Sequence, residues 1–142
     1  MSTKKSNFPK NELSPVSLVA LTSFQENKDK IIKETVQRSL ERVQEVAHHG
    51  EIAQELLTAG LDFTTKMIEA ALSTGEVALL EDELEWAKDR LPHDGVEMEH
   101  VLNRLKIYRD VVNETLPSEY AHEINPFLNW MINYQQTLTE EN

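Results

Sequence analysis

The sequence predicts an all-α protein, a compact bundle of five or six antiparallel helices. Four Gly and five Pro in 142 residues leave long uninterrupted stretches, and apolar residues recur in them at steps of three and four, which is the period of a helix. The connections between these stretches are two to five residues long, as in antiparallel bundles. The length suits one domain, so we assign residues 14–142 to a single helical domain and the polar residues 1–13 to a flexible tail.

The first helical stretch follows Ser14 and Pro15. Serine is a preferred N-cap residue, and proline is favoured at the first position of a helix. The apolar run after them predicts a short helix or the start of a longer one. Ser23 and Glu26 offer a capping box for a second start.

Two long amphipathic helices are predicted next, over residues 27–47 and 51–72. Gly50 ends the first, because glycine tolerates the left-handed conformation of a C-cap, and Gly60 is a weak point in the second. The inward positions of the first are Ile31, Ile32, Val36, Leu40, Val43 and Val46. Those of the second are Ile52, Leu56, Leu57, Leu61, Phe63, Met67, Ile68, Ala71 and Leu72.

Three further helices complete the predicted bundle. One spans residues 76–91, one lies between Gly95 and Pro117, and the last spans residues 119–138, in which Pro126 should kink or restart the helix. The expected inward positions are Val77, Leu80, Leu84, Ala87 and Leu91 in the first; Val101, Leu102, Leu105, Tyr108, Val112 and Leu116 in the second; and Tyr120, Ile124, Phe127, Leu128, Met131, Ile132 and Tyr134 in the last.

The composition excludes several classes of function. A formal net charge of −11 would repel nucleic acids and anionic membrane surfaces. The absence of cysteine excludes disulfides, thiolate metal sites and cysteine nucleophiles. No apolar run approaches the roughly 18 residues that span a bilayer. Since no phosphate loop and no catalytic spacing of Ser, His and Asp is present either, we expect a cytoplasmic protein that is not an enzyme.

The Glu-x-x-His pattern occurs three times and raises the question of a metal centre. The pairs are Glu45 with His48, Glu97 with His100, and Glu119 with His122. Di-iron bundles use this spacing because residues three apart share a helical face. All three pairs, however, lie near predicted helix ends, where acids and imidazoles complement the helix dipole. We therefore predict no metal site, and keep a haem ligated by His93 or His100 as an alternative.

Residues 74–117 resemble the helical sensory domains at the N-termini of bacterial signalling proteins. These include the globin-like domains of stressosome-type regulators and the bundles beside cobalamin-binding modules. The shared features are Gly75-Glu76, Trp86, Leu91, Gly95-Val96, Glu99 and the segment 102–109. The resemblance implies a sensory bundle, and a globin-like arrangement is one form of it.

The light-sensing cobalamin regulators carry a Trp and a Val-x-x-Glu-His element on the helix above the cofactor. Val96, Glu99 and His100 reproduce that element, and Trp86 precedes it. The resemblance thus implies a ligand site at Trp86, Val96, Glu99, His100 and Tyr108, between the third, fourth and last helices. The identity of the cofactor is unknown. No α/β module is present to hold a corrin from below, so cobalamin would need a partner protein.

We therefore expect a small cytoplasmic regulatory or ligand-sensing module without catalytic activity. A small molecule and a protein partner, or a second copy of the chain, are its expected partners. One alternative is a structural module that dimerises or docks through a helix face, with Leu79, Val111 and Trp130 as interface residues. The other alternative is a metal- or haem-binding bundle.

Overall fold

The computed structural model describes residues 13–41, 52–94 and 96–141, and in these residues every regular element is a helix. The elements are α1 (Leu18–Leu40), α3 (Ile52–Thr74), α4 (Ala78–Arg90), the short 3-10 helix η2 (Leu91–Asp94), α5 (Met98–Thr115) and α6 (Ser118–Glu140). The predicted all-α bundle is therefore confirmed. The globin-like arrangement stays a prediction.

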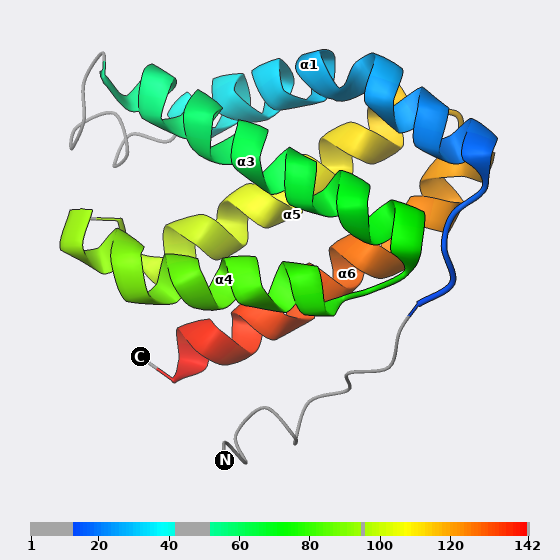
Figure 1. Ribbon diagram of the computed structural model, residues 1–142. Helices are drawn as coiled ribbons and strands as arrows, with labels where there is room; N and C mark the ends of the chain where they lie inside the picture. The colour runs from blue at the N-terminus through cyan, green and yellow to red at the C-terminus, as the bar shows by residue number, and fades with distance from the viewer. Residues whose placement is uncertain (1–12, 42–51, 95, 142) are drawn as a thin grey trace, which may run out of the picture.

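The helices form a closed ring of neighbours (Figure 1). Helix α1 packs against α3 and α5, α3 packs against α4, and both α4 and α5 pack against α6. Helix α6 also contacts α1 and α3, so it touches every other long helix. Consecutive helices joined by short connections run antiparallel, as α3 and α4 do in Figure 1.

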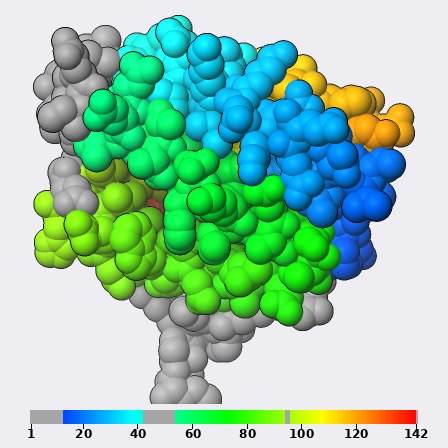
Figure 2. All heavy atoms as spheres, turned by 45° about the horizontal axis from the view of Figure 1, so that its top comes forward, coloured from blue at the N-terminus to red at the C-terminus, as the bar shows by residue number. Residues whose placement is uncertain are grey.

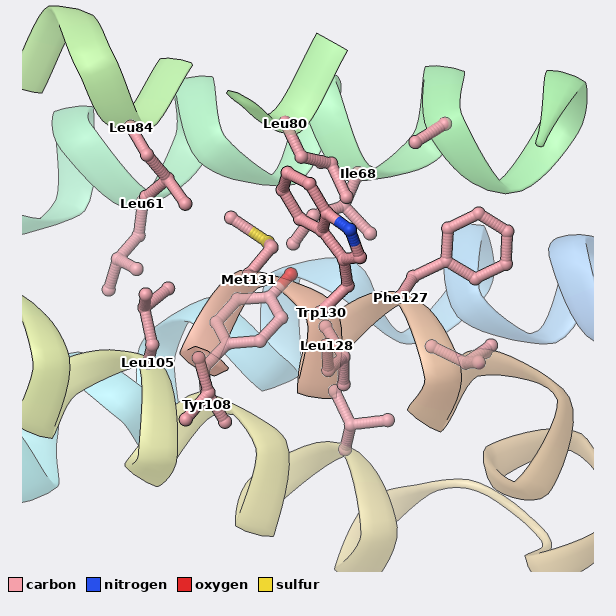
Figure 3. Packing of buried hydrophobic residues seen from close by; sticks show 14 of the residues in the cluster. Leu61, Ile68, Leu80, Leu84, Leu105, Tyr108, Phe127, Leu128, Trp130 and Met131 are labelled. Carbon is pink, nitrogen blue, oxygen red and sulfur yellow. The ribbon is translucent and has the colours of Figure 1, made fainter. Parts of the chain in front are cut away.

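The buried side chains form a continuous apolar core inside this ring (Figure 3). Figure 3 shows the Trp130 indole directed from α6 toward Leu80 of α4 and Ile68 of α3. Tyr108 of α5 and Met131 of α6 are both buried in the same cluster. Burying one large apolar side chain contributes about 1.5–3 kcal/mol, so this shared core stabilises all five long helices together.

Most of the predicted inward positions are buried, but two positions on α3 are not. The side chains of Leu56 and Phe63 are 56% and 50% exposed. They have the spacing of an inward face, yet α4 and α5 do not close over the first half of α3. A surface hollow lies there instead, and both residues line it.

The start of α1 differs from the sequence prediction. Ser17, not Ser14, caps the helix, and its Oγ accepts a hydrogen bond of 3.2 Å from the backbone N–H of Ala20. Ser23 lies inside α1, so the capping box predicted there is wrong. The chain before Ser17 cannot be helical because its backbone pairs with the end of α3, where Val16 N–H donates to the Leu72 carbonyl.

Gly75 makes this pairing possible. It has φ +83°, and a Cβ at this position would lie 2.2 Å from the backbone oxygen of Leu13. The Leu13 N–H donates to the Gly75 carbonyl over 2.9 Å. Leu13, which we assigned to the tail, therefore packs against the core.

Two predictions about the surface and the last helix are also corrected. Val111 and Trp130, proposed as interface residues, are 1% and 9% exposed and belong to the core. Leu79 is only partly buried. Pro126 does not restart the last helix, because α6 continues through it. The fixed φ of proline fits a helix, and the buried neighbours Ile124 and Phe127 hold both sides of the proline in place.

Helix α1 ends at Leu40, with Glu41 as its C-cap, before the helix end that we predicted at Ala47. The predicted cap, His48 to Gly50, lies outside the described residues. The same is true of the inward positions Val43 and Val46. Within the described residues, none of the helices combines the length and the apolar character that crossing a membrane requires.

Candidate ligand pocket

A pocket of about 660 Å³ opens between α3, α4, η2 and the start of α5. Figure 2 shows the surface hollowed between the first half of α3 and the end of α4. Its lining residues are Leu56, Leu57, Ala59, Gly60, Leu61, Phe63 and Thr64 of α3; Glu83, Leu84, Trp86, Ala87 and Arg90 of α4; Leu91 of η2; and Val96, His100, Val101, Arg104 and Leu105 at and before α5. Pockets that bind small molecules commonly measure about 300–1,000 Å³.

Small residues on facing helices keep the pocket open. The hydroxyl of Thr64 on α3 donates a hydrogen bond of 3.0 Å to Glu83 on α4, which sets the register of these two antiparallel helices. Gly60 lies one turn before Thr64 on α3, and Ala87 lies one turn after Glu83 on α4. Because the two helices run antiparallel, Gly60 and Ala87 face each other across the pocket at the same height along the helix axes. A Cβ added to Gly60 would meet no atom within 4 Å. The helices therefore approach at this level without side chains that fill the space between them.

Glu83 is the acidic group of the pocket wall. Its Oε2 accepts the hydrogen bond from Thr64, whereas its Oε1 is buried and has no hydrogen-bond partner among the described residues. Burial raises the pKa of Glu83 from 4.5 to about 6, and the hydrogen bond from Thr64 opposes this shift. A ligand that donates a hydrogen bond could pair with the unused acceptor oxygen of this buried carboxylate.

The remaining ionisable groups of the wall are basic. They are Arg90, His100 and Arg104. Aromatic side chains stand at the rim, where Phe63 is 50% and Trp86 56% exposed. The site thus combines an apolar interior, one buried carboxyl group and an aromatic rim.

The structure brings together three of the five residues proposed as a ligand site. Trp86, Val96 and His100 line the pocket. Glu99 is exposed on the first turn of α5. Tyr108 is buried in the core, where its hydroxyl lies 2.8 Å from that of Thr65 and burial raises its pKa.

The pocket therefore lies beside α3 rather than beside the last helix, where we had expected it. Reasoning from the sequence missed Gly60, Thr64 and Glu83 as wall residues. Gly60 could have been found, because a glycine in the middle of an amphipathic helix costs helical stability and so indicates a local reason for its presence.

The histidine and glutamate pairs do not assemble with one another. Among the described residues, no three acidic or imidazole side chains come close enough to hold a metal ion. Glu97 and His100 are linked through the backbone at the start of α5, where the His100 N–H donates to the Glu97 carbonyl. His93 and His122 are exposed. The pair Glu45 and His48 lies outside the described residues.

Comparison of the chain with protein-family models and with curated proteins finds no match. The resemblance of residues 74–117 to bacterial sensory domains stays a prediction.

Proposed function

We propose that this protein is a small regulatory module that senses an apolar small molecule by binding it in the pocket between α3, α4 and α5. The observation that carries the proposal is the pocket itself, a ligand-sized space with aliphatic walls that Gly60 and Ala87 leave open. The module acts by binding and not by catalysis. A cytoplasmic location and a protein partner that reads the bound state belong to the same proposal.

The packing of the three helices suits a sensor. Helix α3 is held mainly by α1, while α4 packs against α6, and α5 packs against both α1 and α6. A ligand in the pocket contacts α3, α4 and α5 at once. It therefore favours the arrangement of the bundle in which these helices fit it best, and this shift in population is the event that a partner protein can detect.

Binding of N-phenyl-1-naphthylamine, a neutral dye that becomes fluorescent in apolar surroundings, tests the proposal. We expect saturable binding with one site per chain. Gly60→Leu should abolish it, because the leucine side chain extends into the open space at this position. Gly60→Ala is the matched control. Like leucine, alanine raises the helix propensity at this position, but its methyl group leaves most of the pocket free. Equal binding to the wild type and the Gly60→Leu variant would refute the proposal.

Tryptophan fluorescence locates the bound molecule. The chain has two Trp residues: Trp86 lies at the rim of the pocket, and Trp130 is 9% exposed in the core. In the Trp130→Phe variant, the dye should still quench the remaining emission. In the Trp86→Phe variant, quenching should be much weaker, and the opposite pattern would place the dye elsewhere.

The exposed rim favours a second candidate function. Leu56, Phe63 and Trp86 are each at least half exposed, and large apolar side chains that gather on a surface often mark a protein interface. A helix of a partner protein, or of a second copy, would then occupy the groove in place of a small molecule. A concentration-dependent mass in solution that Phe63→Ser abolishes would support self-association through this rim.

A further inference from the structure

We infer that the ligand of this pocket is a hydrophobic amine, with an apolar body between Gly60 and Ala87 and a protonated nitrogen that donates a hydrogen bond to Oε1 of Glu83. This inference rests on the proposed function, because it names the chemical class of the ligand for the same pocket.

The state of Glu83 calls for a hydrogen-bond donor. A buried carboxylate is costly unless its oxygens are paired, and here only Oε2 has a partner, the hydroxyl of Thr64. Oε1 is shielded from solvent and accepts no hydrogen bond from a described residue. A protonated amine supplies both the missing hydrogen bond and the missing positive charge.

The basic residues of the pocket do not supply that charge. Arg90 lies seven positions beyond Glu83 on α4, about 10 Å along the helix axis. Arg104 and His100 stand on α5, and the one described hydrogen bond of Glu83 comes from Thr64. Burial and the Thr64 hydrogen bond account for the shifted pKa of Glu83, and the charge of none of these three residues is among the causes. A ligand cation can therefore pair with Glu83.

The shape and surroundings of the pocket fit the same class of ligand. From Thr64 to Leu57 the wall extends about 10 Å along α3, and Leu61 and Leu84 line the interval. This length accommodates a chain of about eight carbon atoms or a bicyclic ring. Trp86, one turn from Glu83 on α4, offers an aromatic face of the kind that attracts cations. The formal net charge of −11 also raises the local concentration of cations around the protein.

Three ligands with the same eight-carbon body and different head groups test the inference. They are n-octylamine, n-octanol and octanoate, titrated into the full-length chain at pH 7.5 by calorimetry and by displacement of N-phenyl-1-naphthylamine. A charge-assisted hydrogen bond in a shielded site should make octylamine bind at least about tenfold more tightly than octanol. Octanoate should bind most weakly, because it adds a second negative charge beside Glu83.

The variant Glu83→Gln tests the assigned contact. Glutamine keeps the shape of the side chain and an acceptor for Thr64 but lacks the charge. It should reduce the preference for octylamine over octanol to less than about threefold, mainly by weakening the binding of octylamine. Asp82→Asn is the control, because Asp82 is an exposed acid on the same helix outside the pocket wall. That variant should keep the full preference.

The possible outcomes separate this inference from the proposed function. Equal binding of octylamine and octanol to the wild type, or a preference that survives Glu83→Gln, overturns the inference and leaves the apolar pocket in place. Tightest binding of octanoate, weakened by Arg104→Gln, overturns it in favour of an anionic ligand. If neither the dye nor any of the three ligands binds, the proposed function itself fails. The comparison among head groups uses the wild-type chain, so it does not depend on how well a variant folds.

Discussion

At the scale of single residues, Glu83 distinguishes a binding surface from an ordinary core. Its neighbours on the same face of α4, Leu80 and Ala87, are buried, so a leucine at position 83 would complete an apolar wall. A carboxyl group there lowers stability when the pocket is empty, because burial disfavours its charged form. Groups that reduce stability in this way are concentrated at functional sites.

The cost of Glu83 to stability should depend on pH. Its pKa is about 6 in the folded chain against 4.5 in the unfolded one. The folded state therefore holds this proton more tightly, and the penalty is absent below about pH 4.5, grows as the pH rises toward 6, and is complete above that. The difference corresponds to about 2 kcal/mol.

Glu83→Gln removes this titration. We expect the variant to be more stable than the wild type by about 2 kcal/mol at pH 7.5, and by much less at pH 4.5, in urea unfolding followed by circular dichroism. The other ionisable groups of the pocket wall, Arg90, His100 and Arg104, are the same in both proteins, so the comparison isolates the change at position 83. The same difference at both pH values would contradict the assigned pKa.

At the scale of elements, two glycines have opposite roles. Gly75 joins α3 to α4 in a left-handed conformation against the backbone of Leu13, whereas Gly60 lies in mid-helix beside open space. Both are glycines near apolar helical stretches in the sequence, and only their surroundings distinguish them. A methyl group added at each position should therefore change stability in opposite directions.

Gly75→Ala should destabilise the protein. The left-handed conformation costs a non-glycine residue about 1–2 kcal/mol, and the added Cβ would lie 2.2 Å from the Leu13 oxygen. We expect a loss of at least about 2 kcal/mol in the free energy of unfolding. Chemical denaturation measures it, and a loss below about 0.5 kcal/mol would show that the turn adopts another conformation.

Gly60→Ala should stabilise the protein by about 0.5–1 kcal/mol, because alanine favours the helix and restricts the unfolded chain. The substitution meets no neighbouring atom within 4 Å. An increase in the thermal midpoint is the expected result. A decrease would show that the space beside Gly60 is occupied in solution.

At the scale of the whole molecule, Val111 and Trp130, two of the interface residues proposed from the sequence, belong to the core. Trp130 packs into the centre of the bundle and stacks on Tyr134, with ring centroids 5.1 Å apart. Its helix, α6, contacts all four other long helices. A change at this position therefore affects the stability of the entire chain.

Trp130→Ala should reduce the free energy of unfolding by about 3–5 kcal/mol, the usual cost of removing a large buried aromatic side chain. The mass in solution under native conditions should remain that of the wild type. Leu79→Ala is a suitable control, because Leu79 is only partly buried, and its effect should be smaller. If Trp130→Ala changed the mass and left the stability unaltered, Trp130 would belong to an interface after all.

The spacing of apolar residues at steps of three and four, and the positions of Gly and Pro, were enough to predict from the sequence alone that this protein is a helical bundle. The inward stripes of α4 and α5 could be predicted because their apolar residues alternate with charges at a regular spacing. The first cap could not, since Ser14 and Ser17 are both good candidates locally. Ser17 becomes the cap because the preceding backbone pairs with α3, and because the Ser17 N–H and hydroxyl both donate to Glu123, 106 residues away.

For the site, the sequence indicated the region of Trp86, Val96 and His100, which are close to a helix break and therefore close to one another. Glu83, Thr64 and the open space at Gly60 were decided only by the tertiary structure. Whether a glutamate is a solvated surface acid or a buried acceptor depends on which helix faces it. That choice is made by long-range packing, which places Thr64 of α3 against Glu83 of α4, and no local pattern of residues encodes it.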